Sequence, residues 1–141
     1  MLRSLLCFTA LISASYACSC GGGSSSMKIQ FCEADYVATY TIYKDKGNAT
    51  HNYYVGVAED IFKSNGLIQK GSNIRILTKS EPTACGVNWL EDRKKYLLNG
   101  NHCTNGLCVD ACGQMTSAKW EDVAKDIKEA LINGNYDSCS K

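Results

Sequence analysis

The sequence predicts a small, mainly β fold: a barrel of about five short strands with one C-terminal helix, held together by disulfide bridges. Short runs of β-branched and aromatic residues alternate with glycine-containing turn signals, and one amphipathic segment lies near the C-terminus. The 141 residues include nine cysteines but only one proline. A five-stranded Greek-key barrel fits the number of strands, and a two-sheet sandwich is the alternative that the sequence leaves open.

Five segments have the composition and alternation of strands. The expected strands are 36–43, 53–62, 74–78, 96–98 and 107–109. The Asn-Gly pair at 65–66 and Gly71 are turn signals between the second and third strands, the pair at 99–100 ends the fourth, and the pair at 105–106 precedes the fifth. Gly56, inside the second strand, predicts a bulge or kink.

One helix is predicted near the C-terminus. Ser117 has the side chain of an N-cap, and the pair Asn133-Gly134 closes the helix. Its apolar face is formed by Trp120, Val123, Ile127 and Leu131. Glu121 and Lys125 are spaced as an i,i+4 ion pair. We expect this helix to pack on the sheet.

Residues 1–17 have the features of a secretory signal peptide. A positive residue, Arg3, precedes the apolar run 5–12, and small residues stand before a cut after Ala17. Removing these 17 of 141 residues leaves 124, with 14 basic and 14 acidic residues and an even number of cysteines, eight. We therefore expect a secreted, extracellular protein whose mature domain, 18–141, begins with Cys18.

A bacterial lipoprotein also begins with a cysteine at its cleavage site, and 21–26 is a Gly/Ser stretch able to serve as a tether. Ser15 does not fit, because an aliphatic residue is usual at that position. Lipidation of Cys18 would also leave an odd number of cysteines.

Composition and charge exclude several classes of protein. Hydrophobic residues make up 45% of the chain and charged residues 21%, which is typical of a globular protein and not of a disordered one. A formal net charge of +1 argues against nucleic-acid binding and against a polybasic membrane anchor, and no apolar run is long enough to span a membrane. The sequon Asn48-Ala49-Thr50 predicts N-glycosylation of an exposed Asn48.

The eight mature cysteines are expected to form disulfides. A zinc site is the alternative, but the cysteines show no C-x₂-C spacing, and His51 and His102 are not at zinc-finger spacing. Cys18 and Cys20 are too close to bond to each other without strain, so both are expected to reach the body of the domain and hold the N-terminus flat. A local hairpin bridge between Cys103 and Cys108 is sterically possible. That leaves Cys85, Cys112 and Cys139 as distant partners for Cys18, Cys20 and Cys32, with the individual pairs left open.

The arrangement of motifs resembles the inhibitory domain of the tissue inhibitors of metalloproteinases. The matching motifs are Cys18-Ser19-Cys20, Phe31-Cys32-Glu33-Ala34-Asp35, Ala84-Cys85-Gly86, Tyr96-Leu97-Leu98-Asn99-Gly100, the segment 112–120 and Cys139. The resemblance implies a netrin-like module with an OB-type barrel. It also implies the bridges Cys18–Cys85, Cys20–Cys112 and Cys32–Cys139, to which Cys103–Cys108 is an addition. Because the chain ends at Lys141, we expect the single-domain form of the family.

Two features depart from the family pattern. The stretch 21–26 is rich in glycine and serine where the family usually has prolines, and Gly21 lacks the side chain that normally touches the target. The loop before Cys85 reads Pro82-Thr83-Ala84, which is similar to the family's loop in size but not identical to it.

The resemblance implies a protein that inhibits extracellular zinc metalloendopeptidases as a monomer. A catalytic protease zinc keeps one open position that holds water. The free amine and the carbonyl of Cys18 are able to chelate that zinc, because the α-amine pKa of about 7.7–8.0 makes the neutral amine accessible. Ser19 would enter the adjacent specificity pocket, and Thr83 and Ala84 would form a second ridge. With Cys20 and Gly21 these are the expected target-binding residues. We expect no cofactor beyond the target's own zinc.

Other functions have less support in the sequence. The two histidines are in loop-like segments, and no paired acids form a recognisable catalytic motif, so we expect no enzyme. An OB-type barrel alone does not indicate nucleic-acid binding, because fold does not determine function. The main rival is a secreted netrin-like module that binds another extracellular protein and inhibits no protease.

Overall fold

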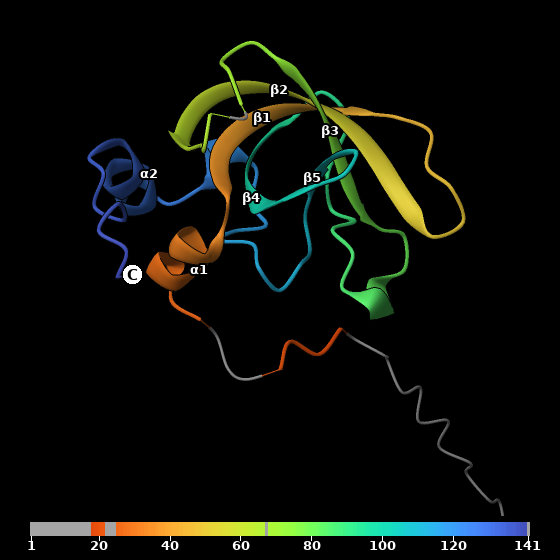
Figure 1. Ribbon diagram of the computed structural model, residues 1–141, viewed down its shortest axis with the longest axis horizontal. Helices are drawn as coiled ribbons and strands as arrows, with labels where there is room; N and C mark the ends of the chain where they lie inside the picture. The colour runs from red at the N-terminus through yellow and green to blue at the C-terminus, as the bar shows by residue number, and fades with distance from the viewer. Residues whose placement is uncertain (1–17, 22–24, 67, 141) are drawn as a thin grey trace, which may run out of the picture.

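The computed structural model describes residues 18–21, 25–66 and 68–140 (Figure 1). The predicted signal peptide and Cys7 lie outside these residues. The described part of the chain contains five strands, two α-helices and two short 3₁₀ helices. None of its helices is long and apolar enough to cross a membrane.

Five strands close into a barrel in the order β1-β2-β3-β5-β4. The strands are β1 (Tyr36–Lys44), β2 (His51–Lys63), β3 (Asn73–Lys79), β4 (Lys95–Cys103) and β5 (Gly106–Cys108). All neighbours are antiparallel except β3 and β5, which run parallel. The predicted barrel is confirmed, the sandwich is excluded, and the architecture is consistent with the OB-type, netrin-like module that the resemblance implies.

Two apolar cores lie on opposite sides of the barrel wall. The alternation along β1 sends Tyr36, Tyr40 and Ile42 into the barrel interior, where they are buried. Val37, between them, faces outward and is covered by the helices. The outer core is formed by Phe31, Ala34, Val37, Leu97, Met115 and Leu131.

A short helix, α1 (Met27–Glu33), precedes the barrel and was not predicted from the sequence. Ser26 is its N-cap, with Oγ accepting a hydrogen bond from Ile29 N. Lys63 Nζ donates to the carbonyls of Phe31 and Cys32 at 3.0 and 2.9 Å, at the end of the helix. Ser26, the last residue of the Gly/Ser stretch 21–26, therefore caps the N-terminus of α1.

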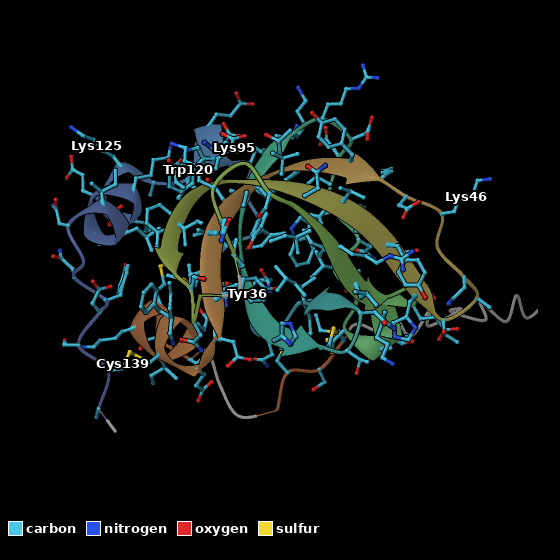
Figure 2. All side chains as sticks on the ribbon, turned by 45° about the horizontal axis from the view of Figure 1, so that its top comes forward. Tyr36, Lys46, Lys95, Trp120, Lys125 and Cys139 are labelled. Atoms are coloured by element: carbon cyan, nitrogen blue, oxygen red, sulfur yellow. A yellow bond between two sulfur atoms is a disulfide. The ribbon has the colours of Figure 1, made fainter. Side chains whose placement is uncertain are left out.

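The C-terminal helix is shorter than predicted. Residues Trp120–Asp122 form a 3₁₀ turn, η2, and α2 covers Lys125–Ile132. The helix starts late because Lys119 pairs with β4 and the two residues after η2 are extended. Ser117 is therefore not the N-cap, and Lys125 pairs with Glu129 instead of Glu121. Lys125 points away from the barrel (Figure 2). Asn133 is the C-cap and Gly134 has a φ of 70°, as the closing signal predicted.

Two glycine predictions in the strands were wrong. Gly56 pairs regularly with Ile42, and the irregularities in the β1–β2 pairing lie between Val37 and Tyr40. Gly56 instead leaves space for the core, because a Cβ there would lie 2.6 Å from the end of the Ile76 side chain. β4 does not end at 99–100 but continues to Cys103.

Candidate functional site

The N-terminal segment 18–21 is joined to the barrel by two disulfides. Cys18 is bonded to Cys85, which follows the 3₁₀ turn η1 (Pro82–Ala84) between β3 and β4. Cys20 is bonded to Cys112, in the loop after β5. We call residues 18–21 and 83–85 the N-terminal edge. Figure 1 shows it below one end of the barrel.

The other two disulfides tie the helices and a hairpin. Cys32 of α1 is bonded to Cys139 near the C-terminus, which lies beside α1 (Figure 2). The bond between Cys103 and Cys108 crosses the hairpin of β4 and β5. Of the four bridges among the described residues, three join the pairs that the family resemblance implies, and the fourth, Cys103–Cys108, joins the pair expected from the hairpin.

The two bridges of the N-terminal edge pack against each other. The sulfur of Cys112 lies 3.5 Å from that of Cys18 and 3.6 Å from that of Cys85. The sulfurs of Cys18, Cys20 and Cys112 all lie within 4.8 Å of one another, a spacing that would suit a metal ion. Each of these sulfurs is already in a disulfide, so none of them is available as a thiolate ligand.

A tight loop presents Cys85 to the N-terminal segment. Cys85 has a φ of 59°, an uncommon conformation for a residue with a side chain. The next residue must be a glycine, because a Cβ on Gly86 would lie 1.9 Å from the carbonyl oxygen of Lys79. Val87 N then donates to the buried Oγ1 of Thr78 at 2.7 Å, which attaches the loop to β3.

The loop that carries Cys112 is joined to the loop that carries Cys85. Val109 N donates to the carbonyl of Leu77 on β3 at 3.0 Å. Ala111 N donates to the carbonyl of Cys85 at 2.8 Å. The two anchors of residues 18–21 therefore belong to one hydrogen-bonded platform.

The target-binding residues expected from the sequence lie on this one edge. The bond between Cys18 and Cys85 holds their Cα atoms 5.0 Å apart, so Cys18 lies close to the residue that directly follows Thr83 and Ala84. Ser19, Cys20, Gly21, Thr83 and Ala84 are exposed, and Cys18 is half-buried. A Cβ at Gly21 would meet no atom within 4 Å, so this position adds no contact of its own to the barrel.

The hairpin between β1 and β2 reaches the same region, which the sequence analysis did not anticipate. Ser80, just before η1, donates from N to the carbonyl of Thr50 at 3.0 Å and from Oγ to that of Ala49 at 3.1 Å. A pocket between the two loops is lined by Ala49, Thr50, Lys79, Ser80, Glu81 and Ala84. The sequence contains no signal for this contact, because it depends on how the hairpin curves over the barrel.

The sequon lies in that hairpin on an exposed turn. Asn48 Oδ1 accepts hydrogen bonds from N and Oγ1 of Thr50 at 2.9 and 3.0 Å. Its Nδ2 donates to the hydroxyl of Tyr53 at 2.7 Å. The exposure of Asn48 meets the steric requirement for glycosylation.

The shifted pKa values among the described residues belong to groups outside the N-terminal edge. Hydrogen bonds from Lys95 lower the carboxyl pKa values of both Glu59 and Asp60 on β2. Burial raises the pKa of the Tyr36 and Tyr40 hydroxyls in the barrel interior. What the edge itself presents is exposed backbone and small side chains held in place by bridges.

Residues 16–140 match the family model described as tissue inhibitor of metalloproteinase. No curated protein matches the chain. Members of this family are inhibitors and not enzymes, so the prediction that the chain is no enzyme is confirmed. The match covers nearly the whole sequence and agrees with the closed five-stranded barrel. The chain therefore belongs to the family of tissue inhibitors of metalloproteinases.

Proposed function

We propose that this protein is a secreted inhibitor of extracellular zinc metalloendopeptidases that acts through its N-terminal edge. The observation that carries the proposal is the pair of adjoining bridges, Cys18–Cys85 and Cys20–Cys112. They hold Ser19, Cys20 and Gly21 exposed, and they hold the half-buried Cys18 next to Cys85, the residue that follows Thr83 and Ala84. A segment immobilised in this way loses little conformational entropy when it enters a protease cleft.

The chemistry requires that Cys18 be the first residue of the mature chain. Its α-amine and its carbonyl oxygen would then form a five-membered chelate on the catalytic zinc and displace the water that attacks the peptide substrate. The amine must be neutral to coordinate, which an α-amine pKa of about 7.7–8.0 permits near neutral pH. The Cys18 sulfur takes no part, because it is bonded to Cys85.

The neighbouring residues would shape the contact with the protease. Ser19 would enter the specificity pocket next to the zinc, and its small side chain fits pockets of different sizes. Thr83 and Ala84 would form the second ridge, held beside Cys18 by the bridge to Cys85. Cys20 and Gly21 would continue the chain along the cleft. The zinc belongs to the target, and the inhibitor needs no cofactor of its own.

Secretion and glycosylation complete the proposal. Cleavage after Ala17 would expose the Cys18 amine, and an oxidising compartment would form the four bridges. Asn48 would carry a glycan on the hairpin. The protein would act as a monomer on one protease.

Changing the N-terminus tests the zinc chelate directly. One extra alanine before Cys18 would move the amine off the zinc and push a residue into the cleft, and selective acetylation would remove the amine lone pair. We expect both changes to abolish inhibition of a matrix-type metalloproteinase. The melting temperature should stay nearly unchanged, because the amine is not part of the barrel. Inhibition constants and thermal unfolding curves measure the two effects.

A substitution at Ser19 is the matched control. Ser19→Gly should change the ranking of inhibited proteases without abolishing inhibition, since the chelate remains. Equal inhibition by the alanine-extended and native proteins would show that the chelate is wrong. If the native protein with a verified Cys18 terminus inhibits no metalloproteinase, a non-inhibitory netrin-like interaction module becomes the better description.

A further inference from the structure

Two buried side-chain amides hold the loop that carries Cys112. We propose that Asn99 and Gln114 are positioning residues for the N-terminal edge. This inference rests on the proposed function. Asn99 is on β4 with an exposed fraction of 2%, and Gln114 is in the loop between β5 and η2 with an exposed fraction of 7%.

Gln114 binds both β4 and its own loop. Its Nε2 donates to the carbonyl of Asn99 at 2.6 Å and to the carbonyl of Asp110 at 3.1 Å. Its Oε1 accepts from Asn99 N at 3.3 Å. The amide therefore pairs with the backbone of β4 as a neighbouring strand would, and it also fixes the start of the loop.

Asn99 binds the same loop from the opposite direction. Its Nδ2 donates to the carbonyl of Gly113 at 2.5 Å, and its Oδ1 accepts from Met115 N at 2.9 Å. Gln30 of α1 adds a further hydrogen bond, from Nε2 to the carbonyl of Gln114 at 3.1 Å.

These contacts bracket the disulfide anchor. The loop carbonyls that the two amides bind belong to Asp110 and Gly113, one on each side of Cys112. Cys112 is in turn disulfide-bonded to Cys20. The loop has no regular secondary structure here, so the directional hydrogen bonds of the amides set where Cys112, and with it residues 18–21, lies relative to the barrel.

Burial makes this arrangement sensitive to substitution. Removing one partner leaves the other groups buried without hydrogen bonds, which costs more than an exposed hydrogen bond would. The loop can relieve this cost by moving away from β4 toward water, and that movement carries Cys112 and Cys20 with it. The N-terminal edge would then lose its alignment with a protease cleft.

The test compares Gln114→Met with Leu131→Ala, which lowers stability through the outer core without removing any hydrogen bond of the two amides. We expect Gln114→Met to weaken inhibition of a metalloproteinase about 10- to 100-fold. Leu131→Ala should change it less than about two-fold at temperatures where both variants are folded. Hydrogen exchange of the Ala111 amide, which is hydrogen-bonded to the Cys85 carbonyl, should accelerate in Gln114→Met and not in Leu131→Ala.

Two outcomes separate this inference from the proposed function. If the native protein inhibits no protease, the proposed function fails, while exchange at Ala111 still reports on positioning. If Gln114→Met inhibits like the native protein with unchanged exchange, the inference is overturned. Should Gln114→Met not fold, Gln114→Glu keeps the acceptor for Asn99 N and removes the two hydrogen bonds donated by Nε2. Faster exchange at Ala111 in that variant would support the inference, and unchanged exchange would overturn it.

Discussion

At the scale of single residues, Gly86 shows how closely the chain approaches itself near the N-terminal edge. A Cβ at this position would lie 1.9 Å from the Lys79 carbonyl oxygen and 3.3 Å from that of Glu81. We expect Gly86→Ala to lower the free energy of unfolding by about 1–3 kcal/mol, because backbone atoms must shift to make room. Gly21→Ala, which meets nothing within 4 Å, should change it by less than about 0.5 kcal/mol. Urea unfolding compares the two, and equal effects would contradict the steric explanation.

Residue patterns predicted one part of the site and missed another. The spacing of Cys18 and Cys20 indicated an N-terminus held by two bridges, because cysteine spacing is visible in the sequence. Asn99 was misread, since Asn-Gly usually marks a turn. In the structure its amide is buried and is hydrogen-bonded through both Nδ2 and Oδ1 to the loop that contains Gly113. A polar residue inside a strand is explained only by a partner that the fold brings to it.

At the scale of secondary-structure elements, Lys95 on β4 forms ion pairs with two carboxylates of β2, across the strand β1 that lies between them. Its Nζ lies 2.7 Å from Glu59 and 3.0 Å from Asp60. Thr39 and Thr41 of β1 donate hydrogen bonds to the same carboxylates. The hydrogen bonds from Lys95 hold the pKa values of both carboxyl groups below their ordinary values.

This cluster predicts a pH-dependent contribution to stability. A carboxyl pKa lowered by folding stabilises the protein above the unfolded-state pKa, about 4 for both groups, and the effect is lost as pH falls. Lys95→Met should therefore lower the unfolding free energy at pH 7, by at most about 1 kcal/mol per pair because the groups are partly exposed. The difference from the native protein should disappear toward about pH 2. Urea unfolding at both pH values measures it, and an equal difference at both would refute the assignment.

The strands were easier to predict than the helices, for a physical reason. Alternation along β1 and β2 is visible in a single sequence because every second side chain enters the core. α1 has only seven residues and is stabilised by Ser26 and by Lys63, which comes from a distant strand. The start of α2 depends on the pairing of Lys119 with Tyr96, a tertiary contact that overrides the helical periodicity of the preceding residues.

At the scale of the whole molecule, closure of the barrel was the feature that the strand count left undecided. The same five strands would also be enough to form a sandwich of two sheets. The choice depends on the parallel contact between β3 and β5, which is limited to the pairs Ile76–Leu107 and Leu77–Cys108. The disulfide between Cys103 and Cys108 holds β5 against β4 and so helps present it to β3.

The bridge between Cys32 and Cys139 also determines how the molecule bears mechanical load. If residues 18 and 140 are pulled apart, the shortest covalent path runs along the backbone from 18 to 32, across the disulfide to Cys139 and on to 140. That path extends to only about 55 Å, whereas the reduced chain would extend to about 400 Å. Single-molecule pulling should therefore detect no extension beyond this length until a reductant is added. The bridges Cys18–Cys85 and Cys20–Cys112 also pass load into the barrel, but the covalent limit on extension prevents a protein held by its two ends in a strained matrix from being drawn out into a linear chain.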